Sequence, residues 1–417
     1  MKKGTGNYST LEYKIAKGLS KLPYLKRVLK KIYRICMVCI YCKKTRQIKT
    51  KKELIAVYPE GETFFGYYDH IPLNQTDEYC VFHQTEFDTS NKPKNKGINI
   101  MLKKMKTNEV FNIATSYAFN WQQGARLQWI NENEIIFNNL NIKKQKLFSQ
   151  IYNVKQKCFK TLDLPIYESC NTFSLTLNFE RLNQYASDYG YCNYRKKLSQ
   201  LKDDGVFILD HKRNKYSLLW SLDKISKVIN IKYCSNNNQH INHIMLSPNA
   251  RTCIFLHRII VKGEVLHTLI LGDLETRNLK ILVSGMVSHC KWVDNENIVA
   301  YLKYKKEKGY FMINIKKNLI EKLKCNSIHT LGDGHPTVAN NKMVIDTYPN
   351  RKQIKSLLLY YFDTNKLTTL TEAYEPLKFN GFSRCDLHPR LTNNGKQIWI
   401  DSTHTGKRML YYLNLTE

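Results

Sequence analysis

RCDLHPRLTNNGKQIWID, residues 384–401, predicts a short β-strand, a tight turn and a second β-strand. The Asn-Asn-Gly turn adopts positive φ at little cost, and Ile398 and Ile400 have the alternate spacing of one face of a sheet. Ahead of the first strand, the side-chain period of two puts Asp386 and His388 on the same side of the backbone. Taken alone, this pair could bind a metal ion, transfer a proton or form a hydrogen-bonded turn.

The same strand–turn–strand form recurs along the chain, most clearly in LQWINENEIIF at 127–137 and CKWVDNENIVA at 290–300. Seven such turns fall near Asn74, Asn131, Asn171, Pro248, Asp294, Asn340 and Asn393. All but one of the intervals between them measure 40 to 57 residues, which suits one four-stranded propeller blade per turn. Few long helical patterns intervene, which argues against alternating strands and helices. The sequence therefore predicts an all-β fold, a seven-bladed β-propeller.

Two places depart from this regular spacing. The turns near Asn171 and Pro248 lie 77 residues apart, so an insertion is expected around residues 183–199. After the turn near Asn393 there is room for only three strands before the chain ends. Closure of the ring then needs a strand from elsewhere, and LIAVY at 54–58 is the expected donor because its pairing would remove two exposed sheet edges.

The composition is typical of a globular protein, but the charge is unevenly distributed along the chain. The chain has 417 residues, 42% of them hydrophobic and 12% aromatic, with a net charge of +30. Residues 1–52 contain 13 Lys and 3 Arg against one acid, Glu12. We therefore divide the chain into a basic amphipathic helical segment, 1–52, and a propeller, 53–417. The 12 Cys are scattered and no signal peptide is visible, which favours reduced thiols and the cytoplasm.

Residues 9–45 have the pattern of a basic amphipathic helix. Apolar residues recur at steps of three and four, Lys and Arg fill much of the remainder, and Pro23 should break or kink the helix. The most apolar run, residues 35–42, is too short to span a membrane. We expect the helix to lie on an anionic membrane surface, at the inner face of the membrane. A solvated basic helix docked on the propeller is the alternative. No nucleic-acid partner is expected, since no helix-turn-helix or RNP pattern is present, and the protein is expected to be a monomer.

In a propeller, residues just before the inner strands converge at one mouth of the channel although they are far apart in the sequence. Polar residues occupy these places and the ends of the second strands: Asp69, Arg126, His240, His243, Arg258, His289, Asp333, His335, Tyr348, Arg384, Asp386 and His388. Five of the 12 His share this register. Imidazoles beside a carboxylate suit a first-row divalent metal ion, and arginines suit an anionic or sugar-like ligand. The alternative is a polar channel mouth in which the histidines are hydrogen-bonded.

Several motifs in this register resemble TolB-like seven-bladed propellers related to the oligogalacturonate lyases. The motifs are GDGHP (332–336), DTYP (346–349), RCDLHPR (384–390) and DSTHTG (401–406). FGYYD at 65–69 is similar to propellers encoded with surface-polysaccharide synthesis genes. The similarity covers residues 60–415 and excludes the basic N-terminal segment.

The resemblance implies a metal site. In those lyases a manganese ion, held by histidines and a glutamine, neutralises the uronate carboxylate while a histidine base and an arginine drive β-elimination. By blade register, His335 and His388 stand at two of the metal-histidine positions and Asp386 takes the place of a third histidine. Ser383 falls near the glutamine, so the amide ligand is absent.

The resemblance also implies catalytic and binding residues. His289 falls at the position of the base, and Arg258 at that of the arginine. The residues expected to bind substrate are Arg126, His240, His243, Arg384, Arg390, Asp69 and Tyr348. The expected function is action on an anionic, uronate-containing surface polysaccharide or its precursor, by metal-assisted β-elimination. The alternative is a non-catalytic propeller that binds glycan or scaffolds capsule biosynthesis.

Overall fold

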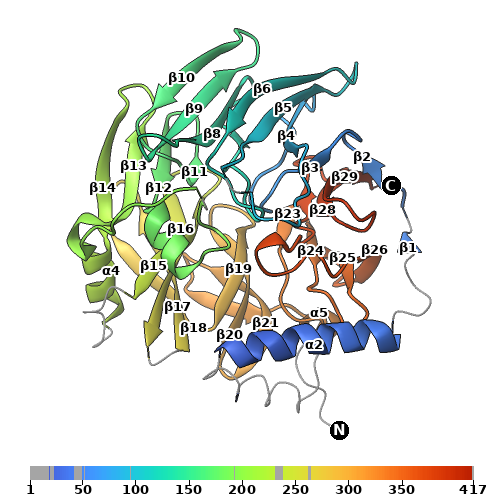
Figure 1. The fold of residues 1–417 in the computed structure, drawn as a ribbon. Coiled ribbons are helices and arrows are strands. Elements are labelled where there is room, and N and C mark those ends of the chain that lie inside the picture. Colours follow the sequence, from blue (N-terminus) through green and yellow to red (C-terminus); the bar gives the residue numbers. More distant parts are fainter. Residues whose placement is uncertain are drawn as a thin grey trace.

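The computed structural model describes residues 18, 23–41, 49–50, 52–93, 95–191, 193–230, 238–261 and 264–415. These residues form seven antiparallel sheets arranged in a ring (Figure 1), so the predicted all-β, seven-bladed propeller is confirmed.

The first three blades consist of β3 (Glu62–Phe64), β4 (Tyr79–Thr85), β5 (Ile98–Lys104) and β6 (Val110–Ser116); β7 (Gln128–Trp129), β8 (Glu134–Asn141), β9 (Lys146–Asn153) and β10 (Cys158–Leu162); and β11 (Glu168–Ser169), β12 (Phe173–Thr176), β13 (Gly205–Asp210) and β14 (Lys215–Ser221). The next two consist of β15 (Gln239–Leu246), β16 (Thr252–Val261), β17 (Glu264–Asp273) and β18 (Leu279–Gly285); and β19 (Val287–Trp292), β20 (Asn297–Tyr304), β21 (Glu307–Asn314) and β22 (Leu319–Lys322). The sixth contains β23 (Thr337–Ala339), β24 (Lys342–Asp346), β25 (Ile354–Tyr361), β26 (Leu367–Tyr374) and the short β1 (Lys49–Thr50); the seventh contains β27 (Arg390–Leu391), β28 (Gln397–Ser402), β29 (Met409–Asn414) and β2 (Ile55–Ala56). The helical elements are α2 (Pro23–Tyr41), α3 (Phe179–Tyr185), α4 (Leu222–Ile229), α5 (Asn326–Thr330) and the 3-10 turns η2 (Leu201–Asp203) and η3 (Gly381–Ser383).

The seventh blade closes the ring by combining strands from both ends of the propeller sequence. β2 pairs antiparallel with β29, so the predicted donor strand within residues 54–58 is confirmed. Val57 extends the pairing, since its N–H donates to the carbonyl of Leu410 at 3.0 Å. β1 adds in the same way to β26 of the sixth blade, which places residues 49–50 in a propeller sheet although they precede the expected boundary at residue 53.

The expected insertion around residues 183–199 is confirmed, and it lies between β12 and β13. It contains α3, whose first turn is capped by the side chain of Asn178. The ring of Phe179 stacks on Tyr191 with centroids 4.6 Å apart, so the insertion packs against itself. Since β11 begins at the face where the other inner strands begin and β12 runs back to it, the insertion lies on that face.

Each blade is covered on both faces by its neighbours, and this changes the burial pattern of the strands. In β28, Trp399 is as completely buried as Ile398 and Ile400, so the strand is not half-buried as its alternation suggests. The turn before it behaves as predicted, with Gly395 at φ 66°. The core is therefore distributed between the blades rather than concentrated in one layer.

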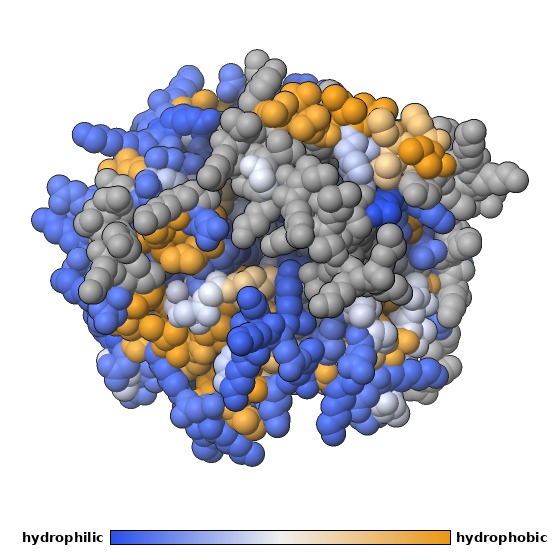
Figure 2. Space-filling view, turned by 90° about the horizontal axis from the view of Figure 1, so that it is seen from below, coloured by the Kyte–Doolittle hydropathy of each residue, from blue (hydrophilic) through white to orange (hydrophobic). Residues whose placement is uncertain are grey.

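Helix α2 exposes its apolar residues. Six large apolar side chains on it are 38–61% exposed: Leu25, Val28, Leu29, Ile32, Ile35 and Ile40. Their spacing puts them on one side of the helix. α2 runs along the lower side of the propeller beneath α5 in Figure 1, and Figure 2 shows a band of apolar side chains along its upper edge, where α2 lies. No helix in the described ranges is long and apolar enough to cross a membrane.

The helix begins at Pro23, the residue expected to interrupt the pattern. The rest of the predicted helical segment 9–45, apart from Gly18, lies outside the described residues.

Val57→Pro should lower the melting temperature more than Val57→Ala does. The Val57 side chain is 2% exposed, so both variants lose packing, but proline also removes the N–H that donates to Leu410. The carbonyl left unpaired costs about 1–3 kcal/mol. Thermal unfolding followed by circular dichroism measures the difference, and equal melting temperatures would contradict a stabilising closure through β2.

Candidate active site

Irregular backbone interrupts the inner strands where they approach the channel mouth. β15 loses register between Asn242 and Met245, and β19 does so between Val287 and Cys290. Three predicted site residues adopt positive φ at such places, namely Arg126 at 55°, His243 at 54° and His388 at 44°. This conformation costs a residue other than glycine on the order of 1–3 kcal/mol, and such strain concentrates at functional sites.

Four of the histidines predicted to converge do meet. The ring centroids of His335 lie 4.1 Å from His289 and 4.4 Å from His388, and His243 lies 5.7 Å from His289. Each of the four is no more than 4% exposed. Tyr67 stands against the group, with its hydroxyl 2.9 Å from Nδ1 of His243. Segments from the first, fourth, fifth, sixth and seventh blades thus share one site.

His240, the fifth histidine of the register, lies outside this group. Its ring stacks on Tyr185 of the insertion at 6.0 Å. Burial lowers its pKa to about 3, and Arg258 adds to that effect. Neither ring nitrogen has a hydrogen-bond partner within the described part of the chain.

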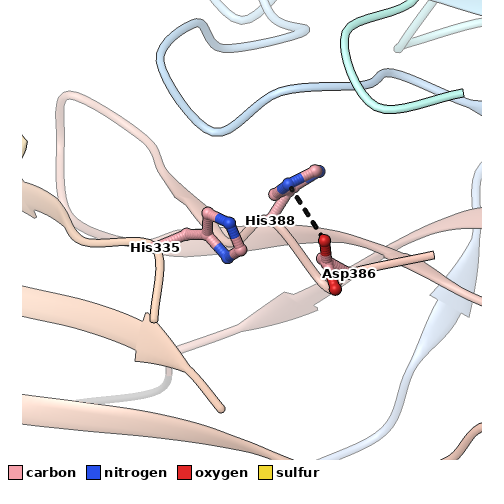
Figure 3. A group of neighbouring side chains, drawn as sticks. All are labelled: His335, Asp386 and His388. Carbon is pink, nitrogen blue, oxygen red and sulfur yellow. Dashed lines mark ion pairs between the residues drawn. The ribbon is translucent and has the colours of Figure 1, made fainter. Parts of the chain in front are cut away.

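His335, Asp386 and His388 form a candidate metal site (Figure 3). Their ligand atoms lie within 4.8 Å of one another, and Nε2 of each histidine is buried without a hydrogen bond among the described residues. Asp346 supports both histidines, at 2.8 Å from Nδ1 of His335 and 3.1 Å from the backbone N–H of His388. A carboxylate on the far nitrogen is the usual support of a metal-binding histidine. Gly334 is required here, because the carbonyl of Asp346 occupies the space of a side chain.

The charges of this group suit a divalent cation. Burial alone would raise the pKa of Asp386, but Arg384 and then His335 lower it to about 2, so the carboxylate is ionised. Burial alone would lower the pKa of His335, but the Asp346 carboxylate raises it. Burial lowers the pKa of His388, whose imidazole is therefore neutral. Two imidazoles and a carboxylate are a known ligand set for first-row metals, so the residues present fit such an ion.

His289 has the surroundings of a proton acceptor. Its Nδ1 lies 3.2 Å from Oδ1 of Asp333, whose other oxygen accepts from the hydroxyl of Ser288 at 2.5 Å. Burial lowers the pKa of His289 although Asp333 opposes the change. A neutral imidazole that donates Nδ1–H to a carboxylate presents Nε2 as a base.

The predicted arginines differ in whether a carboxylate of the protein already pairs with them. Arg384 pairs with Asp386 at 2.9 Å and with Asp188 of the insertion at 2.5 Å, so it holds the candidate metal site and the insertion together. Arg258, on β16, has no carboxylate partner among the described residues, and its Nε is buried without a hydrogen bond. It still lowers the pKa of His243, after burial itself. Of these two, only Arg258 has a guanidinium available for an anion.

Arg390, Arg126 and Asp69, which were expected to bind substrate, lie in buried ion pairs. Arg390 is fully buried, pairs with Asp401 at 2.8 Å and also donates to the backbone carbonyls of Gly66 and Tyr67.

Arg126 is 2% exposed and pairs with Asp69 at 2.8 Å, beside His70 and Glu168. Asp69, His70 and Glu168 are close enough together to hold a cation, but the Arg126 guanidinium already neutralises Asp69. Tyr348 is near the site, since its ring lies 5.8 Å from His335.

Comparison with known structures identifies the fold. No family model and no curated protein sequence matches this chain. An oligogalacturonate lyase in complex with manganese matches with a TM-score of 0.57 at 14% identity, over 88% of this chain and 94% of that chain. A Vibrio parahaemolyticus oligogalacturonate lyase matches with a TM-score of 0.55 at 11% identity, over 89% of this chain and 97% of that chain.

The chain has the fold of these lyases. TolB from Acinetobacter baumannii is also similar, at 12% identity and a TM-score of 0.40, over 82% of this chain and 80% of that chain. The expected resemblance to these propellers is confirmed, and identities this low establish the fold alone.

The sequence placed Asp333 at the channel mouth but did not predict which histidines the carboxylates of the site support. Asp333 and Asp346 were visible in the motifs beside His335, but their pairing with His289 and His335 was not predicted. Asp188, which reaches Arg384 from the insertion, carried no motif. The signal for the first two was position, because each lies within the GDGHP or DTYP motif at the channel mouth.

Arg390→Ala should destabilise the protein strongly, whereas Arg258→Ala should not. The first variant leaves the buried Asp401 carboxylate without its guanidinium, which costs about 3–5 kcal/mol. The second removes a side chain that pairs with no described carboxylate, and a change within about 1 kcal/mol is expected. Urea unfolding of both variants measures the difference in unfolding free energy. A similar loss of stability in both would contradict the distinction between Arg390, which is ion-paired, and Arg258, which pairs with no described carboxylate.

Proposed function

We propose that this protein is a lyase that cleaves an anionic, uronate-containing surface polysaccharide or its precursor by β-elimination. One observation supports this function above the others: a carboxylate-paired imidazole, His289, lies against the His335–Asp386–His388 group in one buried site. The lyase fold agrees with it, and one structure of that fold is an oligogalacturonate lyase in complex with manganese.

His289 is the proposed base. Its Nε2 takes the proton from the carbon next to the uronate carboxylate, and the electron pair of that bond forms a carbon–carbon double bond. The bond to the glycosidic oxygen breaks, and the departing oxygen takes up a proton from the medium. Asp333 holds the imidazole in the tautomer that this step needs.

The charge that develops next to the carboxylate must be neutralised for this step to proceed. His335, Asp386 and His388 would hold a divalent metal ion such as the manganese of the similar lyase structure. When bound there, the ion would act as a Lewis acid toward the uronate carboxylate. Arg258 provides a second positive charge, and its position near His243 suits an anionic group of the substrate.

Metal analysis combined with a turnover assay tests this function. Wild type dialysed against MnCl₂ should retain manganese and release unsaturated product from trigalacturonate. His388→Ala should bind manganese about tenfold or more weakly. His289→Ala should keep the metal and lose about 10²- to 10⁴-fold in turnover.

His404→Ala is the matched control, because this partly buried histidine contacts Ser402 and Tyr411 and none of the four clustered histidines in the described part of the chain. It should behave as wild type in both assays. Wild type that binds trigalacturonate without forming product would overturn the lyase and favour a glycan-binding propeller instead.

We also propose that α2 places the protein on an anionic membrane surface at the inner face of the membrane. A helix docked on its own domain would turn its apolar face inward, but six apolar side chains of α2 are exposed. Residues 1–52 carry the large excess of Lys and Arg noted above, and each cation near an anionic surface contributes about 1 kcal/mol. Apolar and electrostatic terms therefore act together.

Leu29→Glu combined with Ile32→Glu should abolish co-sedimentation with phosphatidylglycerol-containing vesicles. Each large side chain contributes about 1.5–3 kcal/mol on burial, so losing two should weaken binding more than about a hundredfold. Leu319→Glu on β22, where the leucine is 44% exposed, is the matched control and should sediment as wild type. Undiminished sedimentation of the double variant would reject α2 as the membrane contact.

A further inference from the structure

A groove lies beside the candidate active site, on the face that carries the insertion. Its volume is about 490 Å³, within the roughly 300–1,000 Å³ that ligand pockets occupy. One wall is the insertion, with Asn183, Asp188 and Arg195, and the other consists of Lys92, Trp121 and Phe382 from the first, second and seventh blades. The insertion has no counterpart in the other six blades, so this groove is a particular feature of the chain.

The wall between the groove and the active site is one short segment. Asp188 lines the groove and pairs with Arg384, which in turn pairs with Asp386 of the candidate metal group. The next residue, Tyr189, has its ring 5.9 Å from Tyr67 and 5.4 Å from His243. Residues 188–189 therefore border the groove on one side and the imidazole cluster on the other.

The lining combines aromatic rings with amides and few charges. Phe382 is 37% exposed, a high value for a phenylalanine, and the ammonium of Lys92 lies 5.6 Å from its ring centroid. Trp121 is only 4% exposed, so Phe382 provides the aromatic face of the groove. The exposed face of Phe382 suits the C–H face of a sugar ring, and the asparagine side chains of the lining suit sugar hydroxyls.

The groove is also preformed, because its walls are fixed by contacts within the protein. Gly190 packs so closely on Asn183 that a side chain at 190 would collide with the backbone of α3. Asn120 donates to the carbonyl of Tyr189 at 3.0 Å, which fixes the same segment to the second blade. A preformed groove loses little conformational entropy on binding.

We propose that this groove binds the further pyranose rings of the acidic glycan whose terminal uronate occupies the imidazole cluster. This inference rests on the proposed function and adds a substrate class to it: oligosaccharides longer than a disaccharide. The contacts are with ring faces and hydroxyls, since Asp188 offsets part of the positive charge of Lys92 and Arg195.

Isothermal titration with digalacturonate and tetragalacturonate tests the proposal. Wild type should bind the tetramer about tenfold more tightly than the dimer. Phe382→Ala should lose most of this advantage and keep its affinity for the dimer. Phe382→Trp, which restores an aromatic face, should regain it.

Phe111→Ala is the matched control. Phe111 is 44% exposed on β6 with Lys104 5.3 Å from its ring centroid, yet it lies outside the groove, so the tetramer advantage should remain. Equal affinity of wild type for both oligomers, or an undiminished advantage in Phe382→Ala, overturns the groove and leaves the lyase proposal standing. Failure of wild type to bind either oligomer overturns both.

Discussion

The carboxylate of Asp401 accepts the backbone N–H groups of Phe65 and Gly66 at 2.9 Å each, and this joins the last blade to the first. Arg390 completes the junction by pairing with that carboxylate and donating to the carbonyl of Tyr67 at 3.0 Å. Buried charges are costly unless they are paired, and here each charge is paired with the other while it also fixes a backbone segment. The β2–β29 ladder closes the ring, but this ion pair sets where Tyr67 enters the channel and meets the imidazoles.

The backbone around the histidine cluster departs from regular strand geometry. His243 and His388 adopt left-handed backbone, and the inner strands of the fourth and fifth blades slip in register beside the cluster. Ring nitrogens of His335 and His388 are buried without partners in the described structure, which a stable core avoids. A sequence selected only for stability would pair these groups or replace them with apolar residues, so their retention together with backbone strain is the signature of a binding site.

The ring and the meeting of the histidines could be predicted from sequence because both follow from periodicity. A hairpin turn every 40 to 57 residues, with one long interval, fixes the blade count, and blade register then places His289, His335 and His388 at one mouth. The role of each arginine could not be predicted. Arg390 and Arg126 lie in the same register, but their acidic partners come from other segments of the chain, and only tertiary structure shows that those ion pairs form.

Four buried imidazoles in contact cannot all be charged, and the surroundings decide which one differs. Burial lowers the pKa of His243, His289 and His388, whereas the Asp346 carboxylate raises that of His335. The cluster is thus divided between neutral rings with available lone pairs and one ring held against a carboxylate. The neutral rings of His289 and His388 can accept a proton or a cation directly, whereas a metal ion at His335 would displace the proton that Asp346 favours. Asp346 supplies the asymmetry from outside the ring of histidines, which leaves every Nε2 of the His335–His388 pair directed to the site rather than to a protein partner.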